Sequence, residues 1–218
     1  MKTVIINLSP RSQGTSSMLT KYFKERIENF DTKNNEVTIA DLYQNLKDIR
    51  ELLDSIKAAD TLVFIGPCYV VSYPADTIYL LEQMSETEGV LHGQKLYGFI
   101  QGGMPYVHTH EIGLKLLDIF SDENDVKWMG GYVMGGGAVL DGRPLDKAIG
   151  ANKIIPAVHQ FIKNIAMGVE SPEELYKAAA MKVPYPLAVI LSRLMTARIK
   201  KLYREKGINY KVPSPYLK

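Results

Sequence analysis

The residues best suited to bind an anion form a short polar loop near the N-terminus. Its sequence is Ser9-Pro10-Arg11-Ser12-Gln13-Gly14-Thr15-Ser16-Ser17. An apolar run at residues 4–8 precedes the loop, and a helical pattern follows it. A hydroxyl at residues 15–17 can cap that helix, whose first N–H groups then point outward and attract an anion. Arg11 can add a charge-assisted contact. We therefore interpret the stretch as a phosphate-binding loop; the plainer alternative is a capped turn that binds nothing.

The composition of this loop also indicates which kind of phosphate it suits. It lacks the lysine of a P-loop, and it holds only Gly14 where a dinucleotide fingerprint needs three glycines. Hydroxyl and backbone N–H groups can surround the three oxygens of a terminal phosphate monoester. The loop therefore favours a ligand such as FMN over a nucleoside triphosphate or a dinucleotide.

Bulk properties exclude several other classes of protein. Cys68 is the single cysteine of the 218 residues, which excludes an internal disulfide, a multi-cysteine zinc site and an iron–sulfur cluster held by cysteines. The N-terminus does not read as a signal peptide, and no apolar run approaches the ~20 residues of a membrane span. We expect a cytoplasmic protein.

The charge of the chain is unevenly distributed. Residues 171–218 carry a net charge of +7, and the rest of the chain carries a net charge of −5. A chain-wide basic surface for nucleic acid is therefore not expected.

Strand-like and helix-like segments alternate along the chain, and these segments must position the loop. Apolar runs predict strands at 4–8, 36–42, 61–66, 95–101 and 128–134. Helical spacing predicts helices at 16–30, 46–59, 74–84, 108–121 and 152–167, with a polar turn at 31–35. Strands that are apolar on both faces belong in a parallel sheet covered by helices on both sides. The prediction is an α/β domain at residues 1–168, a flavodoxin-like doubly wound five-stranded parallel sheet of order 2-1-3-4-5.

Such a sheet brings three loops together beyond the carboxyl ends of its strands. They are the polar loop at 9–17, a second loop at 67–73 with aromatic and apolar side chains, and a third at 102–106 that begins with two glycines. The first suits a phosphate. The other two offer a flat slot with exposed backbone donors, which suits the isoalloxazine ring of FMN.

At these loops the chain resembles the flavodoxin-like NAD(P)H-dependent FMN reductases and NAD(P)H:quinone reductases. Their first loop typically reads Ser-Pro-Arg-x-x-Gly-Asn-Ser, matched here by residues 9–16 with Thr15 in place of Asn. Their second reads Pro-x-Tyr and then Pro-Ala, matched by residues 67–69 and 74–75, and their third is the Gly-Gly pair at 102–103. The resemblance implies phosphate contacts at Ser9, Arg11, Thr15, Ser16 and Ser17. It implies ring contacts at Pro67, Cys68, Tyr69, Val70, Gly102 and Gly103.

The function that follows is an FMN-dependent oxidoreductase, expected to be a homodimer, that takes hydride from NAD(P)H and passes it to a quinone, a flavin or another small acceptor. The chemistry is carried by the flavin, so no catalytic protein residue is expected. Tyr106 and His110 are candidates for the substrate side of the ring. No metal site is expected, because His108 and His110 diverge on a helix. Two alternatives stay open: a flavodoxin-type electron carrier, and an interaction module that binds no flavin.

The last part of the chain is predicted to be a helical extension, residues 169–218. A basic amphipathic helix is expected at 186–206, ending before Gly207. Packing against the domain or against a sister subunit of a homodimer is one interpretation of this helix. Weak contact with an anionic membrane surface through residues 186–206 is the other.

Overall fold

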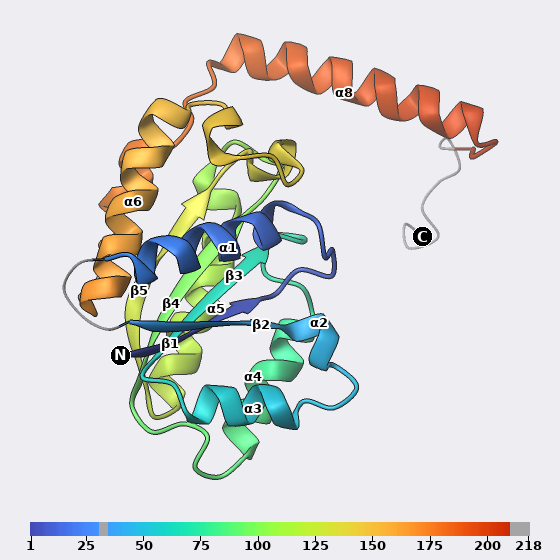
Figure 1. Cartoon of the computed structure of the whole chain (residues 1–218). Coiled ribbons are helices and arrows are strands. Elements are labelled where there is room, and N and C mark those ends of the chain that lie inside the picture. The colour runs from blue at the N-terminus through green and yellow to red at the C-terminus, as the bar shows by residue number, and fades with distance from the viewer. Residues whose placement is uncertain (31–34, 210–218) are drawn as a thin grey trace. The chain divides into compact units, whose positions relative to one another are not determined.

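The computed structural model describes residues 1–30 and 35–209 (Figure 1). The polar turn predicted at 31–35 and the end of the predicted extension therefore fall largely outside the described residues. Internal contacts divide the chain into two compact units, Met1–Met181 and Lys182–Lys218, and each is described by itself. The domain boundary predicted after residue 168 stays a prediction.

The first unit is built on a five-stranded parallel sheet of order β2-β1-β3-β4-β5, which confirms the predicted fold class and strand order. The strands are β1 (Lys2–Asn7), β2 (Glu36–Asp41), β3 (Thr61–Pro67), β4 (Gln94–Gln101) and β5 (Val126–Met134). All seven residues of β3, the central strand, are buried. This burial explains why its sequence is a continuous apolar run rather than an alternating one.

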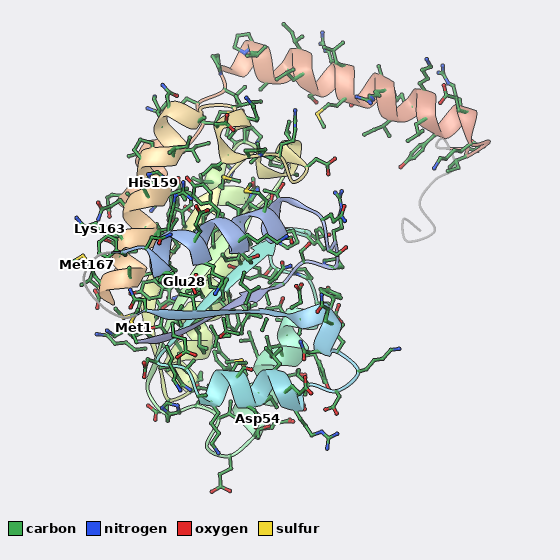
Figure 2. The ribbon with its side chains drawn as sticks, in the orientation of Figure 1. Met1, Glu28, Asp54, His159, Lys163 and Met167 are labelled. Atoms are coloured by element: carbon green, nitrogen blue, oxygen red, sulfur yellow. The ribbon has the colours of Figure 1, made fainter. Side chains whose placement is uncertain are left out.

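Helices cover both faces of the sheet, with α1 and α6 on one face and α3, α4 and α5 on the other (Figure 1). Their bounds are α1 (Thr15–Glu28), α2 (Leu42–Asn45), α3 (Arg50–Lys57), α4 (Asp76–Glu86), α5 (Glu111–Glu123), α6 (Ala151–Met167) and α7 (Glu174–Ala179). Short 3₁₀ turns lie at Val107–Thr109, Gly137–Leu140 and Leu145–Lys147. His159, labelled on α6 in Figure 2, contacts α1 through Tyr22, whose hydroxyl lies 2.7 Å from its Nε2.

Aromatic side chains join α1 and α6 to the sheet. Phe23 on α1 packs edge-on against Phe99 on β4, with ring centroids 5.3 Å apart. Phe99 stacks on Tyr132 of β5 at 5.1 Å, and Phe161 on α6 contacts both. Each of these rings is nearly inaccessible to solvent. Burial of such rings supplies much of the stabilisation of the domain and fixes α1 rigidly on the sheet.

One predicted helix differs in extent from what the sequence pattern indicates. In place of a single helix at 46–59, the structure has α2 at Leu42–Asn45 and α3 beginning only at Arg50. The Asp48 carboxylate accepts hydrogen bonds from the Arg50 N–H at 3.2 Å and from its guanidinium at 2.8 Å. Such local bonds from an Asp side chain compete with helical ones and favour a turn before the helix.

Residues that follow α6 also pack on the sheet. The Ser171 N–H donates to the Met129 carbonyl at 2.8 Å, and the Tyr97 hydroxyl donates to the Val169 carbonyl at 2.8 Å. Tyr176 on α7 is buried. The first part of the predicted extension therefore belongs structurally to the first unit.

Gly130 on β5 is expected to be the glycine on which this packing depends. Its φ is +95°, and a Cβ atom there would lie 2.1 Å from the Ser171 carbonyl oxygen. Gly150 also has a positive φ, +81°, but nothing lies within 4 Å of its Cβ position. Gly150→Ala should therefore cost only the backbone strain, about 1–2 kcal/mol. Gly130→Ala adds a clash and should cost about 1–3 kcal/mol more. Equal free energies of unfolding for the two variants, measured in urea, would contradict this account.

The second unit contains α8 (Tyr185–Glu205). The helix ends before Gly207, as predicted, and Gly207 has a φ of +68°. Within residues 1–30 and 35–209, no helix combines the length and the apolar character needed to cross a membrane.

Candidate functional site

The N-terminus of α1 presents backbone donors that nothing in the described chain uses. Gly14 is its N-cap, no side chain caps the helix, and no acidic residue lies in its first turn. The first helical bond is made by the Met18 N–H to the Gly14 carbonyl at 3.0 Å. The N–H groups of residues 15–17 therefore lack an acceptor among the described residues. Three aligned N–H groups at the positive end of a helix dipole form a favourable environment for an anion.

The hydroxyls predicted to bind phosphate have different partners in the structure. The Thr15 hydroxyl donates to the Gly137 carbonyl at 3.0 Å and accepts the Gly142 N–H at 3.4 Å. The Ser16 hydroxyl accepts a hydrogen bond from the Gln101 amide at 3.3 Å. The half-buried Ser17 hydroxyl has no partner among the described residues. In this conformation, the backbone N–H groups and the Ser17 hydroxyl are available to bind an anion, whereas the Thr15 and Ser16 hydroxyls already have hydrogen-bond partners.

Arg11 is held at the same end of α1 by an acidic residue. Its guanidinium donates to the Asp141 carboxylate at 2.7 Å, and both side chains are more than half exposed. Asp141 has a φ of +50°, a left-handed conformation that is uncommon outside glycine and asparagine. The turn at residues 137–142 thus packs against the polar loop through both Thr15 and Arg11.

Ser9 shapes the loop rather than facing solvent. It is 6% exposed, its N–H donates to the Asn7 side-chain oxygen at 3.2 Å, and its hydroxyl accepts the Arg11 N–H at 3.2 Å. Asn7 in turn donates to the Asp41 carboxylate at 2.7 Å. These bonds fix the exit of the chain from β1. A contact between Ser9 and phosphate stays a prediction.

The second predicted loop is a tight turn that follows β3. The Cys68 N–H donates to the Gln101 carbonyl at 2.6 Å, and the Tyr69 N–H donates to the Ser72 carbonyl at 2.7 Å. Val70 and Val71 have φ values of +51° and +70°, which is strained for β-branched residues. Tyr69 and Val70 are exposed. Burial raises the pKa of the half-buried Cys68 thiol, so that it stays protonated near neutral pH.

The third loop joins the second through Gly102 and a buried histidine. A Cβ atom on Gly102 would lie 2.2 Å from His110 Nε2 and 3.0 Å from Cys68 Cβ, so only glycine fits there. The Gly102 N–H donates to the Met134 carbonyl at 3.2 Å. Gly103 is open: the nearest atom to its Cβ position is Ala138 Cβ at 3.8 Å. The two predicted glycines therefore differ, one being fixed by packing and the other free.

His110 lies beneath these loops and not on their surface. It is 1% exposed, and its Nε2 has no hydrogen-bond partner among the described residues. Its Nδ1 lies 2.6 Å from the Thr109 hydroxyl, which donates its single proton to the Tyr106 carbonyl. Nδ1 is therefore placed to donate to the Thr109 hydroxyl, and Nε2 faces Gly102. Tyr106 is half-buried, and its ring stacks on His108. Substrate-side roles for Tyr106 and His110 stay predictions.

The burial of His110 predicts a pH dependence of stability. Burial lowers the pKa of His110 below its ordinary value of 6.5, so the unfolded state binds a proton before the folded state does. Stability should be fully present above that value and should decline as the pH falls through it. His110→Asn, whose amide can replace the Nδ1 donor, should show a weaker decline than the wild type. Equal slopes for the wild type and His110→Asn in urea titrations at several pH values would contradict the prediction.

Several residues of the site were not indicated by the local sequence pattern. They are Asn7 and Asp41, which shape the first loop, Gln101, which contacts Ser16, and the turn residues Gly137, Asp141 and Gly142. Gly137 follows β5 directly, so its place at the carboxyl edge of the sheet was the signal available in the sequence. Across the described chain, no three His, Cys, Asp or Glu side chains cluster in a way that could hold a metal ion.

A family model and several solved structures match this chain and share its fold. The model of a family described as having a flavodoxin-like fold matches residues 1–109. A search of curated proteins finds no match. Solved structures with a similar fold include an NADH:FMN oxidoreductase in its apo form (16% identity, TM-score 0.61, 85% of this chain and 97% of that one). They also include an FMN-dependent NADH-azoreductase from Bacillus anthracis in complex with FMN (15% identity, TM-score 0.56, 77% and 99%). A flavone reductase also matches, with 15% identity and a TM-score of 0.61. The match covers 77% of this chain but only 62% of the length of the flavone reductase.

Proposed function

The chain belongs to the family with a flavodoxin-like fold, and from this premise we propose that it is an FMN-dependent oxidoreductase. In this proposal, NAD(P)H is the electron donor and a quinone, a flavin or another small molecule is the acceptor. The observation that carries the proposal is the uncapped N-terminus of α1, with three free N–H groups and Arg11 beside them. The named reductases that share the fold, one of them in complex with FMN, support the same class of reaction.

The residues present fit the two ends of FMN. The phosphate would lie at the N–H groups of residues 15–17, with Arg11 and the Ser17 hydroxyl as further donors. The ring would lie toward the loops at 67–73 and 102–106, with Pro67, Cys68, Tyr69, Val70, Gly102 and Gly103 as candidate contacts. The N–H groups of Cys68, Tyr69 and Gly102 already have backbone acceptors. Those of Val70 and Gly103 have none among the described residues and are the available donors to the ring.

Bound FMN would supply hydride acceptance from the nicotinamide and electron delivery to the acceptor. The part of the protein is to orient the ring and to stabilise the charge that develops on it. Preorganised N–H donors such as those of Val70 and Gly103 do this without reorganisation during the reaction. The neutral Cys68 thiol and the neutral His110 ring add no charge near these donors. We therefore assign no acid–base residue to the reaction.

A visible absorption spectrum tests the proposal. The purified protein with added FMN should retain flavin bands after gel filtration, and anaerobic NADPH or NADH should bleach them. Bands that neither nucleotide bleaches would point instead to an electron carrier. Absence of retained flavin would overturn the assignment of the α1 N-terminus.

A further inference from the structure

A shallow groove between α4 and α5 exposes apolar side chains on the first unit. It is lined by Ile78, Leu81, Leu116, Ile119 and Phe120, together with polar residues at its edge. Ile78 is 40% and Ile119 is 50% exposed, while Leu81 and Phe120 form a buried floor. We call this feature the α4–α5 groove. Exposed isoleucines side by side on two helices are typical of a surface that binds a partner.

The edge of the α4–α5 groove is acidic. Glu82 and Glu86, one turn apart on α4, and Glu123 on α5 line it, and no Lys or Arg in the described part of the chain does. All three glutamates are exposed, and none forms an ion pair with another described residue. A partner for this surface should therefore combine an apolar face with positive charge.

Helix α8 has that combination of properties. Leu187, Leu191, Leu194 and Met195 recur at helical spacing and are each between 45% and 63% exposed. Residues 182–218 contain nine Lys or Arg residues and one acidic residue. Residues 1–181 contain seventeen Lys or Arg residues and twenty-three acidic residues. An amphipathic helix that places its apolar face in a hydrophobic groove is a common mode of recognition.

The distribution of charge along α8 favours an acidic groove over a lipid surface. Arg198 and Lys201 follow Leu194 by four and seven residues, so they share its face of the helix. A helix lying on a membrane keeps its basic residues on the polar face. Basic residues within the apolar face instead suit an apolar groove with carboxylates at its edge, which also accounts for the exposed isoleucines on α4 and α5.

We propose that α8 of one copy binds the α4–α5 groove of a second copy, and that the exchange is reciprocal in a homodimer. The contacts are Leu191, Leu194 and Met195 against Ile78 and Ile119, with Arg198 and Lys201 facing the glutamates. The inference is independent of the proposed flavin chemistry, because the groove and α8 lie outside the three loops of that site.

Charge reversal on the two surfaces gives a test in which each variant checks the other. A groove variant, Glu82→Lys/Glu86→Lys, and a helix variant, Arg198→Glu/Lys201→Glu, should each shift the full-length protein to monomer in sedimentation velocity, with the dissociation constant raised about tenfold or more. Mixed together, the two variants should form a heterodimer, because each reversed surface then meets an opposite charge. Glu51→Lys/Asp54→Lys on α3 makes the same charge change elsewhere and should leave the dimer intact.

Three results would overturn the proposal. One is a wild-type protein that is monomeric at the concentrations tested. Another is a dimer that both charge-reversal variants retain. The third is an equimolar mixture of the variants that stays monomeric. A monomeric wild type that pellets with anionic phosphatidylserine vesicles at low salt, and loses this on Leu194→Glu, would assign α8 to a membrane surface instead.

Discussion

Gly102→Ala should destabilise the protein by about 2–3 kcal/mol and abolish retention of FMN, because the site has no room for one more methyl group. The new Cβ would lie 2.2 Å from His110 Nε2 and 2.7 Å from His110 Cδ2. The imidazole has no space to retreat, since it is 1% exposed and its Nδ1 is held by the Thr109 hydroxyl at 2.6 Å. The backbone of the third loop would have to move away from both the second loop and β5.

The neighbouring glycine provides the matched control. A Cβ on Gly103 would meet only Ala138 Cβ, at the ordinary contact distance of 3.8 Å, and its φ is not in the left-handed region. Gly103→Ala should therefore change the free energy of unfolding by less than about 0.5 kcal/mol. Thermal unfolding and FMN fluorescence titration measure both effects.

A double variant separates the clash from other effects of the substitution. Gly102→Ala/His110→Ala removes the ring that the new methyl group would meet, so the two changes should couple and the double variant should be less destabilised than the sum of the singles. Strictly additive effects would mean that His110 is not what excludes a side chain at Gly102.

The contrast between Gly102 and Gly103 illustrates what the sequence could and could not predict. Apolar runs such as residues 61–66 identified the strands, because a strand buried on both faces leaves a continuous signature. The Gly-Gly pair could be placed at the carboxyl edge of the sheet from the order of the elements alone. Which of the two glycines is fixed depends on the ring of His110, eight residues later, and on Cys68 of another loop. Local spacing does not contain that information.

For the charged residues of the site, too, the sequence indicates one residue but not its partner. The predicted phosphate loop contains Arg11, which lies beside Gly14, the N-cap of α1. Its partner, Asp141, lies 130 positions later in a turn that the local sequence pattern does not connect to this loop. The break between α2 and α3, where the sequence predicts a single helix at 46–59, has a different cause. It arises from a short-range bond between Asp48 and Arg50 that outweighs helical periodicity.

Arg11 and Asp141 lead to the second large effect, in which two substitutions act in opposite directions. Arg11→Ala should weaken FMN binding by about 10- to 100-fold, since a hydrogen bond to a charged group is worth about 1.5–3 kcal/mol. Asp141→Asn should strengthen FMN binding by up to about fivefold, because it removes a carboxylate that competes with the phosphate for Arg11. Fluorescence titration of each variant with FMN measures both.

The stability of the two variants should be nearly unchanged. The ion pair joins side chains that are 62% and 63% exposed, and pairs so accessible to water contribute little to folding. A loss of FMN affinity in Arg11→Ala therefore cannot be attributed to unfolding. The control Arg50→Ala removes an exposed arginine at the start of α3 and should bind FMN as the wild type does.

Salt distinguishes a direct phosphate contact from an indirect one. If Arg11 meets the phosphate, the FMN affinity of the wild type should fall as salt rises, and that of Arg11→Ala should fall less steeply. An unchanged salt dependence in Arg11→Ala, or weaker binding in Asp141→Asn, would mean that the pair only shapes the loop. The uncapped N–H groups of α1 would then bind the phosphate without help from a charged side chain.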